Sequence, residues 1–263
     1  MLGTLLKIGK MGIKEYLQYK SVLFLFTLNR IIEVVVYIFV WYAIYNQTGQ
    51  IEGFAINEIA TYYILVVTLV PMSLWGINED IAYSIRKGYI TRELLNPISY
   101  FTYYFGKELG EMGFGLLTAI CTFIVCNIFW TVLMPVNIWA FIAFICILLL
   151  NIPISYFLQM IVGTCGFYTN ATWGMQILRK SIISIFSGLI APLTMFPVAF
   201  QKVANILPFK EFFYTPINIY LGKIQGVEIL FIIGKQLIWV LIMYVLAKVF
   251  FNKAVKKITI NGG

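Results

Sequence analysis

The residue types that most often carry catalysis are missing from this sequence or are placed where they cannot act together. The chain contains no histidine, which excludes imidazole general bases, Ser–His and Cys–His nucleophile pairs and the HExxH zinc helix. Its four cysteines lie in apolar stretches without CxxC spacing, which favours small core residues over a metal or redox site. No GxxxxGK(S/T) phosphate-binding loop occurs. We therefore assign no catalytic site, no metal site and no bound cofactor to this chain.

Two pairs of acidic residues have the right types for metal or acid–base chemistry. Glu79 is adjacent to Asp80, and Glu108 precedes Glu111 by about one helical turn. Basic residues lie near these pairs in the sequence, namely Arg86, Lys87 and Lys107. Because both pairs fall close to expected helix ends, we interpret them as local charge pairing rather than as a catalytic site.

Arg30 and Glu33 stand out because they are charged residues inside an apolar stretch. An ionised group at membrane depth costs about 2.5 to 3.5 kcal/mol unless it finds a partner or water. Their spacing of three residues allows them to meet on one helical face. We expect a mutual ion pair facing the bundle interior, with contact to a partner subunit or to a charged substrate head group as the alternatives.

The elements that position these residues are predicted from the composition, which is 61% hydrophobic and 11% charged. A soluble domain has about 25% charged residues, so this chain is expected to lie in a bilayer. About 20 mostly apolar residues are needed to cross the hydrocarbon core as a helix. The stretches that qualify are residues 21–45, 57–76, 101–130, 138–167, 173–197 and 228–251. The sequence therefore predicts an all-α polytopic membrane protein with six transmembrane helices in a single domain, residues 1–263.

The basic residues predict the orientation of these helices, because Lys and Arg are retained on the cytoplasmic side during insertion. They are concentrated in the N-terminal segment, in the connections after the second and fourth stretches and at the C-terminal end. Only Lys202, Lys210 and Lys223 fall in segments on the other side. We therefore expect both termini in the cytoplasm. The formal charge of +8 is interpreted as a topology signal rather than as a nucleic-acid-binding surface.

The N-terminal segment, residues 1–20, is expected to remain attached to the membrane domain. It lacks the short apolar region and small-residue cleavage site of a signal peptide. Lysines and apolar residues interleave along it, which predicts an amphipathic helix on the inner membrane surface. A polar tail with some helix is the alternative.

Small residues recur along the fifth stretch at three- and four-residue spacing, which places them on one helical stripe. They are Ser181, Ser184, Ser187, Gly188 and Ala191. Such a stripe permits close packing against another helix or subunit, and a wall of a substrate path is the alternative. Because Pro192 removes a backbone donor, this helix is expected to kink or break before Pro197.

The segment that follows, residues 193–226, is rich in apolar residues but is interrupted by Pro197, Pro208 and Pro216. The runs between these prolines are too short to span a bilayer. Irregular backbone at membrane depth is tolerated only where protein or a water-filled cavity surrounds it. We therefore expect short re-entrant or interfacial helices that cap the bundle and gate an outward exit. An ordinary outer loop lying in the head groups is the alternative.

The connection between the second and third stretches, residues 78–97, has the composition of a partner-binding element. It is predicted to form a short amphipathic helix that stops at Pro97. Its apolar side consists of Ile81, Ile85, Tyr89, Leu94 and Leu95. Its charged side consists of Arg86, Lys87, Arg92 and Glu93. Such a helix suits docking of a cytoplasmic partner, although a plain surface loop is the alternative.

These features together resemble the membrane subunit of a type-2 ABC transporter, in the branch similar to daunorubicin-resistance and viologen-exporter permeases. The Ile85-Arg-Lys-Gly88 to Leu94-Leu-Asn-Pro97 stretch is similar to that family's signature after the second helix. Gly188 to Pro197, followed by Leu207-Pro208-Phe209 and Pro216, is similar to its fifth helix and outer re-entrant segment. The plan of six helices with a basic elbow helix also agrees. Asn96 departs from the pattern, which has an arginine before the proline.

The resemblance implies a division of labour between subunits in the bacterial plasma membrane. Two copies of a cytoplasmic ATPase bind ATP and Mg, and a second permease, identical or paralogous, completes the path. It implies export of an amphipathic drug-, peptide- or lipid-like substrate by alternating access. The permease subunits that form the path would be surrounded by membrane lipids. The absence of a phosphate-binding loop agrees with this division, which gives the chain no ATPase activity of its own.

The resemblance also implies roles for individual residues. The ATPase-coupling residues would be Ile85, Arg86, Lys87, Gly88, Tyr89, Arg92, Glu93, Leu94 and Leu95. The translocation path would be lined by Tyr62, Tyr63, Thr68, Met72, Ile182, Ile185, Phe186 and Leu189. The outer gate would contain Pro192, Phe196, Pro197, Leu207, Pro208 and Phe209. Residues 1–20 would be the elbow helix.

Two other classes of function were weighed against a transporter driven by an ATPase. A secondary transporter or channel would show an inverted repeat with broken helices at the midplane, or a relay of buried acids. A membrane-embedded lipid enzyme would need clustered acids or a nucleophile with a base. The sequence offers neither pattern.

Overall fold

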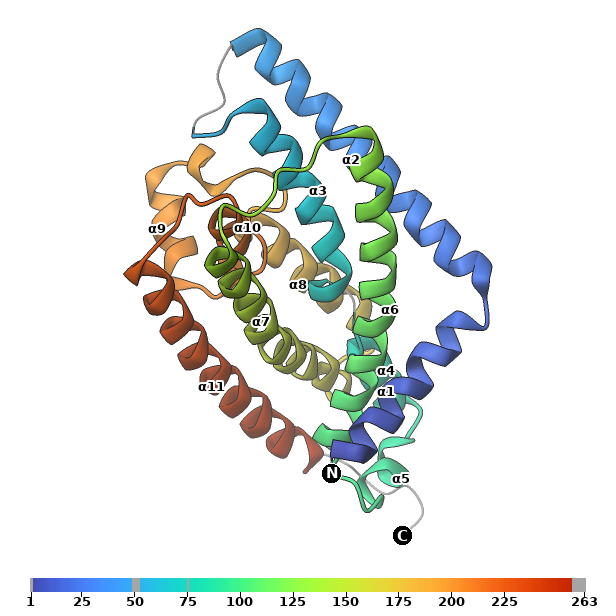
Figure 1. Cartoon of the computed structure of the whole chain (residues 1–263). Helices are drawn as coiled ribbons and strands as arrows, with labels where there is room; N and C mark the ends of the chain where they lie inside the picture. Colours follow the sequence, from blue (N-terminus) through green and yellow to red (C-terminus); the bar gives the residue numbers. More distant parts are fainter. Residues whose placement is uncertain (1, 49–52, 75, 257–263) are drawn as a thin grey trace.

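The computed structural model describes residues 2–48, 53–74 and 76–256, which form helices joined by short connections (Figure 1). The α-helices are α1 (Leu2–Leu17), α2 (Lys20–Thr48), α3 (Ile56–Ser73), α4 (Asn78–Arg86), α5 (Ile90–Leu94), α6 (Tyr100–Phe129), α7 (Ile138–Thr164), α8 (Thr172–Phe186), α9 (Val198–Ile206), α10 (Tyr214–Tyr220) and α11 (Val227–Val255). Single 3-10 turns are η1 (Cys165–Phe167), η2 (Leu193–Met195) and η3 (Phe209–Glu211). No strand occurs in the described residues, so the predicted all-α fold is confirmed there.

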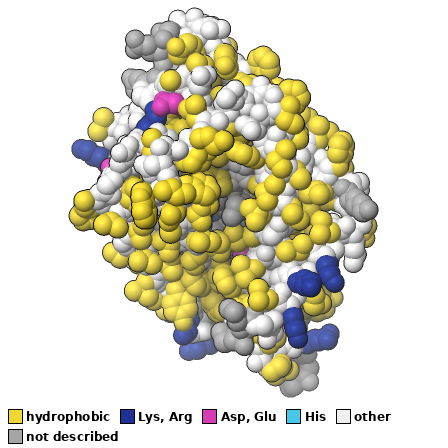
Figure 2. Space-filling model, in the orientation of Figure 1, with side chains coloured by type: hydrophobic (Ala, Val, Ile, Leu, Met, Phe, Trp, Pro, Cys, Tyr) yellow, Lys and Arg dark blue, Asp and Glu magenta, His cyan; other side chains and the backbone are white. Residues whose placement is uncertain are grey.

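Four described helices, α2, α6, α7 and α11, are long and apolar enough to cross a membrane. Hydrophobic side chains cover the broad middle of the molecule in Figure 2. Most of the Lys and Arg side chains visible there gather at the lower end, where Figure 1 shows α1, α4 and α5. An apolar middle with charges near one end is the surface expected of a protein embedded in a bilayer.

The remaining two predicted spans form shorter helices than the sequence suggested. The second stretch forms α3, whose apolar part is Ile56–Pro71, and the fifth forms the 15-residue helix α8. A helix of that length is about 22 Å long, which is less than the hydrocarbon thickness of about 30 Å. Four of the described helices therefore have the length and composition of a full span, and the six-span topology stays a prediction.

The predicted break of the fifth stretch before Pro197 is confirmed, and it lies ahead of Pro192. The helix stops at Phe186, and Gly188 then adopts a φ of +82°, which side chains other than glycine rarely tolerate. The hydroxyl of Tyr62 donates to the Gly188 carbonyl at 2.7 Å, and the Tyr214 amide donates to the Ser187 carbonyl at 2.9 Å. The small-residue stripe is consequently divided, because Ser187, Gly188 and Ala191 lie beyond the helix.

The hydrophobic core is centred on α3, which other helices surround on all sides. Nearly every residue of its apolar part is buried, and Tyr62 and Tyr63 are fully inaccessible. The Tyr63 ring stacks on Tyr37 and Trp41 of α2, with centroids 4.7 and 5.5 Å away. Its hydroxyl donates to the Ile190 carbonyl at 2.9 Å. A mostly apolar sequence is expected of a membrane span, but it is equally expected of a helix that is buried among other helices. The burial of α3 therefore accounts for its apolar composition.

Helices α1 and α6 cross at a seam of glycines that the sequence analysis did not identify. A Cβ atom added at Gly110 of α6 would lie 3.0 Å from the Gly9 carbonyl oxygen and 3.1 Å from Gly12 Cα. A Cβ atom at Gly106 would meet the Ile8 side chain at 2.9 Å. The Gly106-x-x-x-Gly110 spacing is the familiar signal for close helix approach in membranes. The seam fixes α1 against the first half of α6.

Substituting Gly110→Leu should separate α1 from α6, because the new side chain meets backbone rather than a flexible side chain. Overpacking of this kind costs about 1 to 3 kcal/mol. The expected result is earlier proteolysis in the connection between α1 and α2, measured on the purified protein in detergent. Gly3→Leu is the control, because a Cβ atom at Gly3 of α1 has no neighbour within 4 Å. Equal protection of the two variants would show that the seam does not hold α1 in place.

Residues 193–226 form η2, α9, η3 and α10, which lie away from α4 and α5, on the side of the molecule where α3 begins (Figure 1). Prolines begin three of these pieces, since Pro192, Pro197 and Pro208 are the N-cap residues of η2, α9 and η3. The expectation of short helices in this segment is confirmed. Helix α10 is almost entirely buried and packs against α7.

Candidate functional site

The segment 78–97 forms two short helices rather than the single helix predicted. Helix α4 ends at Arg86, and Gly88 turns the chain with a φ of +75° before α5 begins at Ile90. The Thr91 hydroxyl donates to the Gly88 carbonyl at 2.7 Å and stabilises the turn. The two helices therefore present different faces, and α4 and α5 have separate contacts.

The apolar residues of this segment divide between an inner and an outer face. Ile81 is fully buried, and Ile85 is half-buried against the same core cluster. In contrast, Tyr89, Leu94 and Leu95 are exposed, and Leu95 is 86% exposed. The inner pair attaches α4 to the membrane helices. The outer residues form an uncovered apolar tip, which is the kind of surface that marks a protein interaction site.

The charged residues of the segment also separate into two groups. Arg86 donates to the Thr172 hydroxyl and, at 3.5 Å, to the Asn170 carbonyl, so it ties α4 to the start of α8. Glu93 accepts hydrogen bonds from the Ser84 hydroxyl at 2.7 Å and from the Tyr104 hydroxyl at 3.0 Å. These two side chains thus have intramolecular partners. Lys87 and Arg92 are exposed beside the apolar tip.

Helix α4 lies directly on α7, η1 and α8. A Cβ atom added at Gly163 of α7 would stand 2.6 Å from Ile81 Cβ and 3.0 Å from the Asn78 carbonyl oxygen. At Gly166 it would stand 3.2 Å from Ala82 Cα. Only glycine permits this approach, because any side chain would push α4 away. A displacement of α4 must therefore move the end of α7.

A buried polar cluster joins α4 to the surrounding helices. The Arg179 guanidinium of α8, 3% exposed, donates to the Leu74 carbonyl at 2.8 Å and to Asn78 Oδ1 at 3.4 Å. The Gln159 amide of α7 donates to Glu108 Oε1 of α6 at 2.8 Å. Buried polar groups with fixed partners hold helices in one arrangement. The cluster thus connects the ends of α3, α6, α7 and α8 at the level of α4.

The acidic pairs of the sequence analysis have different surroundings. Lys107 pairs with Asp80 at 2.7 Å, so local charge pairing is confirmed for that residue. For Glu108 the expected pairing was wrong, because its carboxylate is buried and receives a hydrogen bond from Gln159 instead. Nearness in sequence to Lys107 misled this prediction, since successive residues of a helix point in different directions.

The residues proposed for the translocation path lie in two different environments. On α3, Tyr62, Tyr63 and Thr68 are buried inside the subunit, and the side chain of Met72 is outside the part that the structure describes. On and after α8, Leu189 is buried, Ile182 and Phe186 are half-buried, and Ile185 is exposed. Exposed side chains recur along the whole length of α8, whereas α3 is enclosed by other helices.

The open face of α8 is a stripe at helical spacing. Trp173, Ile177, Ser181 and Ile185 are exposed along it, whereas Ile183 on the opposite side is fully buried. Lys180, Ser184 and Ile190 line a shallow groove beside this stripe. A helix with one buried face and one apolar, uncovered face is suited to packing against another helix or subunit.

Arg30 and Glu33 of α2 form the ion pair that their spacing predicts. The distance from the Arg30 guanidinium to Glu33 Oε2 is 2.6 Å. The side chain of Arg30 is 12% exposed and that of Glu33 is 30% exposed. The pair satisfies both charges within one helix, which lowers the cost of placing them in an apolar stretch.

The residues proposed for the outer gate lie in the connections around α9. Phe196 stacks on Phe200 of α9, which in turn stacks on Phe186 at the end of α8, with centroids 4.6 and 4.7 Å apart. Phe200 was not anticipated, although it connects a gate residue with a path residue. Among the others, Pro192, Pro208 and Phe209 are buried, Leu207 is half-buried, and Pro197 is exposed.

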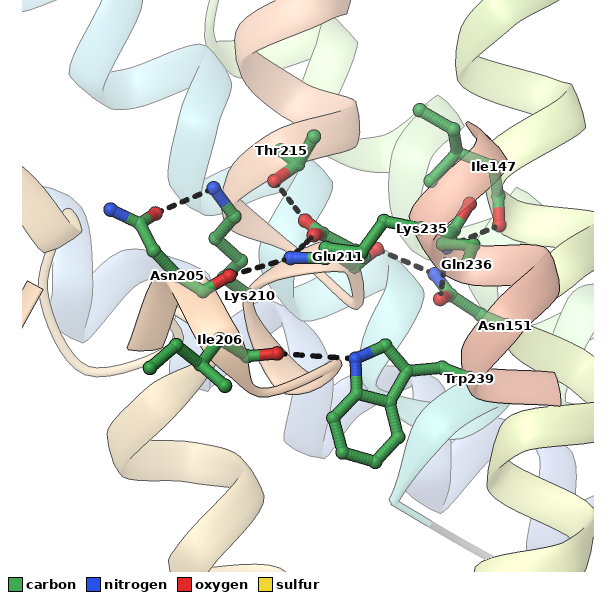
Figure 3. A network of polar contacts seen from close by, with 10 residues as sticks. All are labelled: Ile147, Asn151, Asn205, Ile206, Lys210, Glu211, Thr215, Lys235, Gln236 and Trp239. Carbon is green, nitrogen blue, oxygen red and sulfur yellow. Dashed lines mark hydrogen bonds and ion pairs between the residues drawn. The ribbon is translucent and has the colours of Figure 1, made fainter. Parts of the chain in front are cut away.

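A polar network joins this end to α7 and α11, and the sequence analysis missed it (Figure 3). The Glu211 carboxylate is fully buried, pairs with the Lys235 ammonium and accepts from the Thr215 hydroxyl. Asn151 of α7 donates to the Glu211 carbonyl at 2.6 Å, and Gln236 donates to Asn151 Oδ1 at 2.8 Å. The network links η3, α10, α7 and α11.

Lys235 also donates to the Asn205 carbonyl at 2.9 Å, and Trp239 donates to the Ile206 carbonyl at 3.1 Å (Figure 3). The last turn of α9 is therefore attached to α11 as well. The only signal in the sequence was a lysine inside an apolar span together with a lone glutamate in the preceding segment. Charged residues in such positions usually have a partner.

Comparison with known families places these features in context. Residues 31–262 match the family described as ABC-2 family transporter protein. The match includes α3 to α11 and most of α2, and it begins after α1. No curated protein matches the chain.

Proposed function

The chain belongs to the ABC-2 family of transporter proteins, and we propose that it is the permease subunit of an ATP-driven exporter. In this proposal two permease subunits, identical or paralogous, form the path between them. Two copies of a separate ATPase bind ATP and Mg on the cytoplasmic side. The branch similar to daunorubicin-resistance and viologen-exporter permeases is the part of the family that we favour, on the motifs at Ile85–Gly88 and Leu94–Pro97.

The proposed topology has six crossings in the bacterial plasma membrane, with both termini in the cytoplasm. Helices α2, α6, α7 and α11, which are long and apolar enough to cross a membrane, make four of these crossings. Helix α3 makes the second crossing from within the bundle, and α8 makes the fifth together with the irregular residues that follow it. Helix α1 lies along the inner surface as an elbow helix. The gathering of basic residues near α1, α4 and α5 supports this orientation (Figure 2).

The observation that carries the proposal is the two-sided design of α4 and α5. Their outer side offers Leu94 and Leu95 with Lys87 and Arg92 as a docking surface. Their inner side is fixed to α7 through the close approach at Gly163 and to α8 through Arg86. A partner that moves the outer side therefore moves the ends of two membrane helices. Such an element transmits force, whereas a plain loop would absorb it.

The path itself is proposed to lie along the open stripe of α8 rather than along α3. The second permease would face this stripe, with Ser181 and Ile185 near the midline. The apolar walls suit an amphipathic drug-, peptide- or lipid-like substrate, because such walls adapt to cargo of varied shape. At the far end, the aromatic stack of Phe186, Phe200 and Phe196 would open and close the exit.

The test is a double substitution of Leu94→Asp and Leu95→Asp in the full chain, expressed with its cognate ATPase. Placing two charges in an apolar docking surface should weaken assembly about tenfold or more, since each buried leucine contributes about 1.5 to 3 kcal/mol. Co-purification of the ATPase and ATP turnover above that of the ATPase alone are measured. Because both side chains are exposed in the subunit, insertion into the membrane should not change.

Met134→Asp is the matched control for this experiment. Met134 is 82% exposed, similar to Leu95, but it lies in the connection between α6 and α7 at the other end of the molecule. Its substitution should leave assembly unaltered. Unchanged assembly in the double variant would remove the docking role of α5. Solute transport by the purified chain alone in liposomes would contradict the dependence on an ATPase.

A further inference from the structure

We propose that a stripe of lysines on α1 binds the head groups of anionic phospholipids. The lysine stripe consists of Lys7, Lys10 and Lys14, whose side chains are all exposed. Their spacing of three and four residues places them within about 60° of one another around the helix axis. The inference goes beyond the proposed function, because this binding requires neither the ATPase nor a cargo.

The glycine seam with α6 decides which way the lysine stripe points. A Cβ atom added at Gly9 would lie 3.5 Å from the Gly106 carbonyl oxygen. A Cβ atom added at Gly12 would lie 3.2 Å from Gly110 Cα. These two glycines of α1 therefore face α6, and the helical turn places the lysine stripe roughly on the opposite side. The seam thus holds the lysines away from the protein, toward the surroundings of α1.

The neighbouring helices set the depth of the lysine stripe. Helix α1 ends at Leu17, and the stretch of α2 that can cross a membrane begins at Ser21, so the last turn of α1 lies at the membrane boundary. The first half of α1 is held at a similar depth, because the seam residues Gly106 and Gly110 belong to about the first three turns of α6. The lysine stripe therefore lies near the lipid head groups, which are those of the inner leaflet in the proposed topology.

The protein itself does not neutralise the charge of the lysine stripe. None of its three lysines has an ion-pair partner within the residue ranges that the structure describes. The one acidic residue of α1, Glu15, is not three or four residues from any of them, so it is not their neighbour on the helix surface. The Lys and Arg side chains visible in Figure 2 gather mostly at this end of the molecule. Such a surface attracts a lipid with a net negative charge more strongly than a zwitterionic lipid.

Exposed apolar side chains border the lysine stripe and favour a lipid over a soluble anion. By helical spacing, Leu6 and Leu17 lie along one edge of the stripe and Met11 along the other, and all three are exposed. Tyr19, also exposed, follows at the membrane boundary, where tyrosine is common. Lysine ammonium groups can reach lipid phosphates while the apolar side chains meet the acyl chains. A soluble phosphate would neutralise the lysines but leave the apolar side chains in water.

The test compares phosphatidylglycerol with phosphatidylcholine that has the same acyl chains. The purified full chain in an uncharged maltoside detergent is titrated with each lipid, and bound lipid is counted by native mass spectrometry. We expect phosphatidylglycerol to bind at least tenfold more tightly than phosphatidylcholine. Equal binding of the two lipids would overturn the proposal. The assay contains no ATPase, so its outcome does not depend on whether the proposed function is correct.

Variants then assign the binding to the lysine stripe. Lys7→Gln combined with Lys10→Gln and Lys14→Gln should weaken phosphatidylglycerol binding about tenfold or more, because each lysine near a head group adds to the attraction. Arginine at the same three positions keeps the charge and should preserve the binding. Since the three side chains are exposed, both variants should fold as the wild type does. Unchanged affinity in the glutamine variant would refute the location.

A matched control removes three lysines from other parts of the surface. Lys202 on α9 and Lys253 and Lys256 at the end of α11 are also exposed. Replacing these three with glutamine lowers the net charge by the same amount and should leave phosphatidylglycerol binding as in the wild type. An equal loss in the two triple variants would show that the overall charge attracts the lipid, and this would contradict a site on α1.

A final arm separates a lipid from the other anions that lysines can bind. Glycerophosphoglycerol, the head group without acyl chains, should not displace phosphatidylglycerol at equal concentration, and Leu6→Ser with Leu17→Ser should weaken lipid binding several-fold. Displacement by the head group alone would identify a soluble phosphate as the ligand and overturn the proposal. Normal lipid binding by the glutamine variant of the lysine stripe, together with loss of ATPase co-purification, would assign the stripe to a protein partner instead.

Discussion

Replacing Lys235 with methionine is expected to lower the free energy of unfolding by about 3 to 5 kcal/mol, because a buried carboxylate then loses its cation. The Glu211 side chain is fully inaccessible, and Lys235 is its ion-pair partner. The same substitution removes the bond from Lys235 to the Asn205 carbonyl, so α9 and α11 should also loosen. Denaturant titration in detergent, followed by tryptophan fluorescence, measures the change.

Two further variants separate the charge effect from simple loss of a contact. Glu211→Gln with Lys235→Met removes both charges and should recover most of the lost stability, since a neutral pair leaves no unpaired ion. Lys202→Met is the control, because Lys202 is exposed on α9 and has no ion-pair partner among the described residues. A double variant that is no more stable than Lys235→Met would show that the buried charge is not the source of the loss.

Substituting Gly163→Leu is expected to uncouple the subunit from its ATPase while leaving the two proteins assembled. The leucine Cβ would stand 2.6 Å from Ile81 Cβ and 3.0 Å from the Asn78 carbonyl oxygen, so α4 has to move away from α7. The docking surface at Leu94 and Leu95 is not touched. ATP turnover of the assembled complex should therefore fall to that of the ATPase alone, with a loss of about 1 to 3 kcal/mol in stability.

The measurement compares co-purification with ATP turnover in the same preparation. Gly234→Leu in α11 is the matched control, because a Cβ atom there has no neighbour within 4 Å. Loss of both assembly and turnover would mean that α4 and α5 move as one unit, and normal turnover would mean that the α4–α7 contact transmits nothing. This experiment and the Leu94 and Leu95 substitutions thus test the inner and outer sides of the segment separately.

The long apolar helices and the short helices of residues 193–226 were predictable because their determinants are local. A run of about 20 apolar residues defines a possible span, and proline interrupts a helix wherever it stands. The ion pair of Arg30 and Glu33 was predictable for the same reason, since residues three apart meet on one helix. Each of these features depends on neighbours within one or two turns.

The sequence was uninformative where a distant residue decides the outcome. Helix α8 ends at Phe186, and Tyr62, far away in the sequence, donates to the Gly188 carbonyl just beyond that end. Apolar spacing alone gave no indication that α3 is enclosed by other helices, or that Tyr62 and Tyr63, which the resemblance assigned to the path, are buried inside the subunit. The glycine seam was overlooked although Gly106 and Gly110 have the spacing for it, because its partner glycines lie on α1.

The sequence by itself determined that this protein enters a membrane, that it is helical and where its backbone must break, since hydropathy, proline and glycine act locally. The tertiary structure alone decided which charges meet, which helix is enclosed and which face stays open. Glu211 pairs with Lys235, and Gln159 donates to Glu108, because helix packing brings together residues that no sequence period relates. Long-range packing is set by the fit of whole helix surfaces, which local patterns do not encode.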